Sequence, residues 1–195
     1  MPSNKANRSS LPWEPFKEGR KPTRRYHHIS LFSGAGGTDI GLEYAGFKTV
    51  FSNDIEEDAV ETYLHNNPEA RTHATCGDIT KLKLPKIKDD IDLLTAGFPC
   101  QPFSKSGKQM GMEETRGTLF WNIAKIIETH KPSIVLLENV RNITGPRHMH
   151  EWEVIIQTLR DLGYRVSEDP HVVSPHLIKP EFCRIILTAH LNHKP

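Results

Sequence analysis

The chain has 195 residues, 25% of them charged and 36% hydrophobic, which is typical of one globular domain with a short extension. No apolar run approaches the roughly 20 residues that span a bilayer, and the polar N-terminus lacks a secretory signal, so we expect a cytoplasmic protein with no membrane partner. The three cysteines form no CxxC pair and the eleven histidines are scattered, so the sequence predicts neither a disulfide framework nor a metal site.

The net charge of +1 is unevenly distributed. Residues 1–26 hold seven Lys or Arg and two Glu, a net charge of +5, so the remainder carries −4. The segment is also rich in Ser, Asn and Pro, which predicts a disordered tail over residues 1–26 and a folded domain over residues 27–195. Such a tail either contacts nucleic-acid phosphates or serves only as a solubilising terminus, and the sequence leaves both interpretations open.

Short apolar runs alternate with amphipathic stretches from residue 27 onward. We expect strands at residues 29–32, 49–53, 74–76, 91–96 and 133–138, and weaker strands at 165–173 and 184–189. Helices are expected at residues 38–45, 56–66, 119–130 and 151–162. Strands that alternate with helices of this length predict an α/β fold with a mostly parallel sheet and helices on both faces.

In such a sheet, ligands bind beyond the carboxyl ends of the strands. The glycine-rich residues 33–37 follow the first strand, where glycines let the chain turn tightly and let a ligand approach the backbone, although a plain tight turn is an equally good explanation. Asp54 follows the second strand, where an acid can accept both ribose hydroxyls. Asp78 follows the third, where it can accept an adenine amine. These residues predict an adenosine cofactor without a phosphate site, which fits S-adenosylmethionine.

Two further segments at strand ends carry reactive groups. Cys100 follows Pro99 in a loop that continues with polar residues and two lysines; a loop cysteine taken alone is most often inert. Glu138 ends an apolar strand, where burial raises the pKa of a carboxyl group and favours the protonated acid. A neutral Glu can donate to a ring nitrogen, whereas a helix cap or a solvated strand end is the alternative.

Taken in order, these segments resemble the DNA cytosine-5 methyltransferase family. Residues 97–108, Gly-Phe-Pro-Cys-Gln-Pro-Phe-Ser-Lys-Ser-Gly-Lys, closely resemble that family's catalytic loop, and residues 116–120 match the start of the helix that follows it. The resemblance covers roughly residues 27–175. It implies a Rossmann-like, S-adenosylmethionine-dependent methyltransferase fold, DNA as the partner and a system of the restriction-modification type.

The resemblance also implies a role for each residue of the site. Cys100 attacks C6 of cytosine as a thiolate, Glu138 protonates or hydrogen-bonds N3, and Pro99, Asn139 and Arg184 shape the surroundings of the base. The implied cofactor-binding residues are Phe32, Gly34, Gly36, Gly37, Asp54, Ile55, Asp78, Ile79 and Leu119. The implied substrate-binding residues, on or near a loop that closes over a flipped base, are Gln101, Ser104, Ser106, Lys108 and Arg116.

The sequence departs from the family pattern in two places. The family's Gln-x-Arg-x-Arg segment corresponds to residues 174–187, where Arg184 stands for the second arginine and the first falls on Phe182 or is deleted. Family members also continue with a target-recognition domain and a final helix. Three interpretations stay open: a DNA cytosine-5 methyltransferase, a tRNA cytosine-5 methyltransferase on the same fold, or a split subunit or non-catalytic remnant. A split enzyme would need a second polypeptide that carries the recognition domain.

Overall fold

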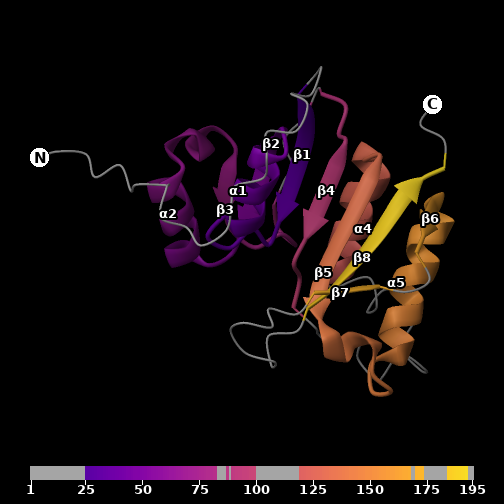
Figure 1. Cartoon of the computed structure of the whole chain (residues 1–195). Coiled ribbons are helices and arrows are strands. Elements are labelled where there is room, and N and C mark those ends of the chain that lie inside the picture. Colours follow the sequence, from indigo (N-terminus) through magenta and orange to yellow (C-terminus); the bar gives the residue numbers. More distant parts are fainter. Residues whose placement is uncertain are drawn as a thin grey trace, which may run out of the picture.

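The computed structural model describes residues 25–82, 87, 89–99, 119–167, 170–173 and 184–192 (Figure 1). Its strands are β1 (Tyr26–Leu31), β2 (Phe47–Asp54), β3 (Ala74–Cys76), β4 (Leu93–Ala96), β5 (Ile134–Val140), β6 (Tyr164–Val166), β7 (His171–Val173) and β8 (Arg184–Leu191). Its helices are α1 (Gly37–Tyr44), α2 (Glu57–Asn66), α4 (Leu119–His130) and α5 (Met149–Asp161), and short 3-10 helices cover Pro68–Thr72 and Arg141–Thr144. Each element expected from the sequence is present with small shifts at its ends, except the strand expected over residues 165–173.

The strands form one sheet in the order β3-β2-β1-β4-β5-β8-β6, with β7 beside β8. Neighbours from β3 to β5 are parallel, whereas β8 runs antiparallel to β5, β6 and β7. The weaker strand expected over residues 165–173 is divided into β6 and β7. Antiparallel neighbours need no helical crossover. In the described part of the chain, no helix joins β6 to β7 or β7 to β8.

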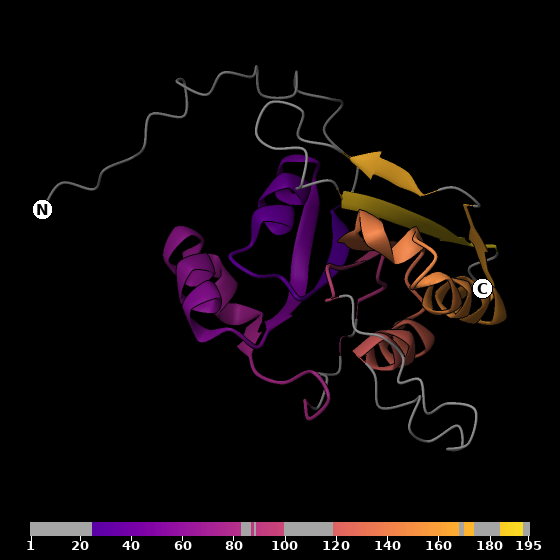
Figure 2. The same cartoon turned by 90° about the horizontal axis from the view of Figure 1, so that it is seen from below.

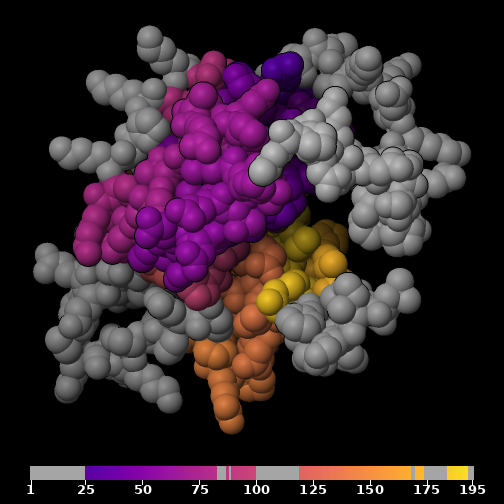
Figure 3. Space-filling model, turned by 90° about the vertical axis from the view of Figure 1, so that its left-hand side faces the viewer, coloured from indigo at the N-terminus to yellow at the C-terminus, as the bar shows by residue number. Residues whose placement is uncertain are grey.

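Helices cover both faces of the sheet, as the sequence predicted (Figure 2). The connections through α1 and α2 step outward from β1 to β3, and the connection through α4 steps the opposite way from β4 to β5. Because such crossovers are right-handed, steps in opposite directions place their helices on opposite faces. Seen from the β3 side, residues of the N-terminal half cover the upper part of the molecular surface (Figure 3).

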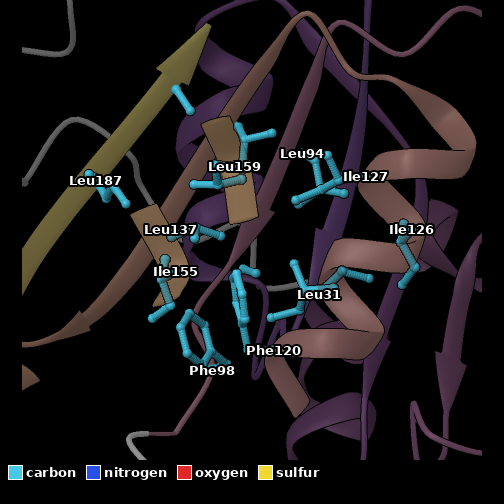
Figure 4. Close-up of a cluster of buried hydrophobic side chains, with 14 of the residues drawn as sticks. Leu31, Leu94, Phe98, Phe120, Ile126, Ile127, Leu137, Ile155, Leu159 and Leu187 are labelled. Atoms are coloured by element: carbon cyan, nitrogen blue, oxygen red, sulfur yellow. The ribbon is translucent and has the colours of Figure 1, made fainter. Parts of the chain in front are cut away.

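The hydrophobic core lies between the sheet and the helices α4 and α5 (Figure 4). Leu31, Leu94 and Leu137 come from adjacent strands and are at most 4% exposed. Phe120 and Ile127 of α4 lie two turns apart on one side of that helix, the helical spacing that the sequence pattern predicted. This core fixes β1, β4 and β5 side by side, with their carboxyl ends at one edge.

The opposite face of β1 and β4 carries buried polar side chains beside the apolar Leu93. His28, Ser30 and Thr95 lie there, between the apolar positions of β1 and β4, and all three are buried. They contact Asp39 of α1 and Thr49 of β2 through hydrogen bonds. We call these five residues the polar layer.

The polar layer does not extend under the whole sheet. Over β5 and β8 the same face is only half-buried, at Ile134, Leu136, Ile186 and Thr188.

None of the helices in the part of the chain that the structure describes combines the length and apolarity needed to cross a membrane.

Candidate active site

The candidate site lies where the strand order reverses, at the carboxyl ends of β1 and β4. From this point β2 and β3 continue in one direction and β5 in the other. The turn after β1, the segment Gly97–Pro99 after β4 and the end of β5 therefore converge, which is the position where open α/β sheets bind ligands. The predicted convergence of these segments is confirmed for their described residues.

The turn after β1 is held in an unusual backbone conformation. Phe32, Gly34 and Gly36 have φ angles of +57°, +53° and +82°. Such angles are easy for glycine, but they are strained for Phe32, and non-glycine residues of this kind cluster at ligand sites. The N–H of Ser33 donates to the carbonyl oxygen of Asn53 (3.0 Å), so the turn is fastened to the end of β2.

Beside this turn is a cleft of about 520 Å³, a volume typical of small-molecule sites. The cleft is lined by Phe32, Asn53, Asp54, Ile55, Gly77, Asp78, Ile79, Thr80, Gly97, Pro99 and Leu119. Six of the nine predicted cofactor residues are among them. The three glycines Gly34, Gly36 and Gly37 are not, so the turn supports the cleft from outside its wall.

The two predicted acids reach the cleft from neighbouring strand ends. Asp54 accepts hydrogen bonds from the N–H of Gly34 (2.7 Å) and of Glu56 (2.9 Å), one on each oxygen, and each oxygen keeps a further lone pair for a ligand. The Thr80 N–H and hydroxyl both donate to Oδ1 of Asp78 and lower the pKa of that exposed carboxyl group. Asp78 is thus held as a carboxylate acceptor.

The lining set fits an adenosine group. Phe32, Ile55, Ile79 and Leu119 offer apolar surface to a flat heterocycle, and Asp54 and Asp78 offer acceptors to hydroxyl and amine donors. No Lys or Arg is among the lining residues within the described ranges, although the exposed Lys81 Nζ lies 3.4 Å from Oδ2 of Asp78.

Glu138 lies at the carboxyl end of β5, next to the start of the cysteine-containing segment. A Cβ atom added at Gly97 would lie 3.2 Å from its Oε2, so the carboxyl group closely approaches the backbone after β4. Burial raises the pKa of Glu138, although the nearby Arg184 acts in the opposite direction. The direction predicted from the sequence is confirmed.

Arg184 begins β8 and lies beside Glu138 because β5 and β8 are antiparallel. Its Nε is 2.9 Å from Oε1 of Glu138, but the N–H does not point at that oxygen, so the contact is an ion pair without a well-aligned hydrogen bond. Both side chains remain more than one-third exposed. Oε1, the oxygen that faces Arg184, is itself buried.

Asn139 connects β5 to the segment after β4. Its Nδ2 donates to the carbonyl oxygen of Phe98 (2.9 Å), and its Oδ1 accepts the N–H of Val140. The side chain is buried, at 5% exposure. Asn139 thus fixes the backbone that leads into Pro99, which agrees with the positioning role that the resemblance implied.

Several predicted residues lie outside the described residues, and the structure does not bear on their placement. They are the nucleophile candidate Cys100 and the substrate-binding candidates Gln101, Ser104, Ser106, Lys108 and Arg116. The expected tail over residues 1–26 lies outside as well, except for its last two residues. Within the described ranges, no group of three or more His, Cys, Asp or Glu side chains is arranged to hold a metal ion.

Sequence reasoning missed the residues that support the site. Asn53 is buried, and its Nδ2 donates to the carbonyl oxygens of Thr75 (3.0 Å) and Gly77 (2.9 Å), which joins the ends of β2 and β3 beneath the cleft. Asp39 anchors α1 to β1 and β2 by accepting hydrogen bonds from Ser30 and Thr49. The alternation His28-Ile29-Ser30-Leu31 is the one sequence signal for that layer, because a strand of period two places its polar residues on one face.

Comparison with known proteins agrees with this arrangement. The family model described as C-5 cytosine-specific DNA methylase matches residues 26–176. The Type II methyltransferase M.AluI of Cellulosimicrobium cellulans is 48% identical over 165 residues, which make up 81% of this chain and 31% of that protein. The Type II methyltransferase M.NlaX of Neisseria lactamica is 40% identical over 167 residues, or 85% of this chain and 52% of that protein.

Solved structures show the same fold. The S. pombe Dnmt2 methyltransferase superposes with a TM-score of 0.63 and 27% sequence identity, covering 88% of this chain and 51% of that chain. The present chain thus spans between about a third and a half of the length of these relatives.

Proposed function

The chain belongs to the C-5 cytosine-specific DNA methylase family, and on that premise we propose that it transfers a methyl group from S-adenosylmethionine to C5 of cytosine in DNA. One observation carries the proposal. Gly97 and Pro99 form part of the wall of the adenosine-type cleft, and the Glu138 carboxyl group closely approaches Gly97. A cofactor in the cleft and a base against Glu138 would therefore meet at the segment that leads into Cys100.

The residues of the cleft have the chemistry that S-adenosylmethionine requires. We expect Asp54 to accept the ribose hydroxyls and Asp78 the adenine amine, while Phe32, Ile55, Ile79 and Leu119 pack against the ring. When bound, this cofactor supplies an electrophilic methyl group. The carboxylates of Asp54 and Asp78 at the cleft are compatible with its positive charge.

For the reaction itself, cytosine C5 needs activation. The Cys100 thiolate forms a bond to C6 while Glu138 donates a proton or hydrogen bond to N3, so electron density moves toward C5. After methylation, loss of the C5 proton and cleavage of the C6–sulfur bond release the base and the thiolate. The raised pKa of Glu138 supports its role as the donor, since burial favours its protonated form.

Arg184 lowers the pKa of Glu138, the proposed proton donor. Its guanidinium group beside Oε1 favours the carboxylate and so opposes the effect of burial. We expect the ion pair to separate when a flipped base enters, which would leave Glu138 free to hold its proton. Asn139 would keep the backbone at Phe98 in place during this change.

The covalent step can be trapped. In the presence of S-adenosylmethionine, DNA that contains 5-fluorocytosine should form a stable adduct with the chain, because fluorine at C5 blocks the elimination that follows methyl transfer. Cys100→Ser should abolish the adduct, whereas Cys76→Ser and Cys183→Ser serve as matched controls and should retain it. An adduct that survives Cys100→Ser would show that the nucleophile is wrongly assigned. The same assay on tRNA tests the alternative substrate, and adduct formation with tRNA alone would reject DNA.

We propose that full activity requires a target-recognition domain supplied by a second polypeptide or a further segment. The support is the share of its relatives that the chain spans and the half-buried sheet face over β5 and β8. The body after residue 26 has a net charge of −4, so by itself it attracts a polyanion weakly. Robust, sequence-specific methylation by this chain alone would contradict the proposal, and restored activity on adding such a polypeptide would support it.

A Type II restriction-modification role and a cytoplasmic location are part of the same proposal. The relatives named above are Type II methyltransferases, which is the support for the first. Loss of methylation at one short DNA sequence after deletion of the gene would test the role, and fractionation of the cells would test the location.

A further inference from the structure

Helix α1 begins at the glycine turn beside the cofactor cleft, yet few of its side chains are buried. The helix has eight residues, and only Asp39 is buried. Ile40 and Tyr44 are 37% and 64% exposed. Burial of apolar side chains therefore contributes little to fixing the start of this helix, and other contacts must set where the turn lies.

The most direct of these contacts comes from α2. Gly36 is the N-cap of α1, and a Cβ atom placed on it would lie less than 3.0 Å from Cγ, Cδ2 and Cε2 of Tyr63. The phenol ring thus fills the space that a side chain at position 36 would take. Tyr63 is only 1% exposed, so its ring has no freedom to swing into solvent.

We propose that Tyr63 is a positioning residue for the cofactor, its ring acting as a fixed stop against Gly36 that holds the turn of residues 32–37 at the cleft wall. This inference rests on the proposed cofactor site. Tyr63 does not line the cleft, and neither does Gly36. Its effect passes through the turn to Phe32, which does.

The surroundings of the ring explain why its orientation is defined. The hydroxyl oxygen lies 3.4 Å from Nε2 of His73, and the two rings meet edge to face with centroids 6.4 Å apart. Burial raises the pKa of Tyr63, and the Asp39 carboxylate raises it further, so the hydroxyl keeps its proton. The chain of contacts from Gly36 to His73 is therefore short and closely packed.

A double-mutant cycle on cofactor binding tests the proposal. Tyr63→Leu should weaken binding of S-adenosylmethionine about tenfold in calorimetry, whereas Tyr63→Phe, which keeps the ring, should stay within about threefold. Gly36→Ala should weaken binding strongly, because its methyl group meets the ring. In the Tyr63→Leu background that loss should shrink by at least about fivefold, since leucine lacks Cε2 and its smaller side chain can turn away from position 36, so the clash is reduced while the backbone strain remains.

Gly34 offers a matched control. It also has a positive φ, of +53°, but a Cβ added there meets nothing within 4 Å. Gly34→Ala should therefore lose the same affinity in both backgrounds, within about twofold. If the effects of Gly36→Ala and Tyr63→Leu simply multiply, as those of Gly34→Ala and Tyr63→Leu should, the proposal is wrong.

Urea unfolding of the same variants without cofactor separates positioning from stability. A merely structural role would lower the free energy of unfolding and leave the affinity of the folded protein unchanged, and that result would overturn the proposal. Should a variant not fold, hydrogen exchange on the wild-type chain gives the answer. Cofactor should slow exchange at the N–H of Ile40, which bonds Gly36, and at that of Asn67, which bonds Tyr63, but not in α5. Unchanged exchange at Asn67 would contradict it.

Failure of the cofactor proposal has a different signature. In that case the wild-type chain shows no binding at millimolar cofactor, whatever the variants do, and a role of Tyr63 in positioning cofactor falls with it. Wild-type binding together with no coupling between positions 36 and 63 would reject the role of Tyr63 alone.

Discussion

The two faces of the central strands are equally buried but chemically different. Toward α4 and α5, Ile29 and Leu31 of β1 and Leu94 of β4 pack against apolar side chains. Toward α1, the intervening His28 and Ser30 are at most 1% exposed, and they are hydrogen-bonded. Apolar contact is non-directional, whereas a hydrogen bond fixes two atoms relative to each other. The first face thus contributes mainly to stability, and the second fixes the position of α1 relative to the sheet.

The polar layer forms one continuous chain of hydrogen bonds from the sheet to α1. Thr49 donates to Oδ1 of Asp39 (3.0 Å), so its oxygen is free to accept from Nδ1 of His28 (3.1 Å). A neutral imidazole with its proton on Nδ1 then accepts at Nε2 from the Thr95 hydroxyl (2.8 Å). The central strand β4 is thereby connected by hydrogen bonds to the helix that begins at the cofactor turn.

The largest expected effect comes from breaking the apolar face. Leu94→Ala removes a fully buried side chain at the centre of the sheet and should lower the free energy of unfolding by about 2–5 kcal/mol in urea. At temperatures where the variant is folded, its affinity for S-adenosylmethionine should stay within about threefold of wild type, because the position of α1 does not depend on this contact. A large loss of affinity in the folded protein would mean that the two faces are not separable.

Acid should lower the free energy of unfolding through a group on the polar face. Burial lowers the pKa of His28 from 6.5 to about 4, with Asp39 opposing and His73 adding to the shift. Between these two values the unfolded chain binds a proton that the folded chain excludes. Stability is therefore full above pH 6.5 and is lost as the pH falls toward 4, by about 3 kcal/mol from this group.

His28→Gln tests this prediction, because a glutamine amide does not titrate. Its unfolding free energy should fall less steeply than that of wild type between pH 6.5 and 4. Some slope should remain from His73, whose pKa is also lowered by burial. Equal slopes for the two proteins would exclude His28 as the titrating group.

The contrast between the faces also explains what the sequence could predict. Helices and strands followed from local periodicity, and the meeting of strand ends followed from the rule that parallel strands share their direction. Asp54 and Asp78 could be named because each directly follows a strand. By contrast, the contact of Tyr63 with Gly36 depends on how α2 lies across α1, and a tyrosine at helical spacing looks like an ordinary core residue.

The Glu138–Arg184 pair is a second contact that local sequence patterns could not predict. The resemblance assigned both residues to the site, but their contact depends on β8 running antiparallel to β5. Local sequence patterns carry the tendency to form a strand, and they do not carry its direction or its register with a distant partner. The tertiary arrangement had to supply both.

A smaller effect is expected from Thr95→Val, at the position next to Leu94. Valine keeps the shape of threonine but removes the partner of His28 Nε2, and leaving a buried acceptor unpaired costs about 1–3 kcal/mol. Unlike Leu94→Ala, this change should also weaken cofactor binding, because it loosens the connection to Asp39. Urea unfolding and calorimetry on both variants compare the faces at adjacent residues. Thr188→Val, on the same face but at a half-buried position, is the control and should change neither quantity.

The smallest effect on stability is expected where the polar face reaches the candidate active site. The register of β4 with β5 places Glu138 on the same face as Thr95. Gly97→Ala adds a methyl group 3.2 Å from Oε2 of Glu138, and because the neighbour is the end of a flexible side chain, the free energy of unfolding should change by less than about 1 kcal/mol.

The ionisation of Glu138 should nevertheless respond to that methyl group. A methyl group against the carboxyl excludes water, so the pKa of Glu138, already raised by burial, should rise further. An NMR titration of the Glu138 carboxyl carbon, assigned by its absence in Glu138→Gln, measures this directly. Arg184→Leu should shift the same signal in the same direction, since it removes the cation that lowers this pKa, whereas Arg184→Lys should shift it less. A lower pKa in Gly97→Ala would mean that the carboxyl group had moved out toward solvent, and the close approach of Glu138 to the backbone after β4 would then not be what keeps its proton in place.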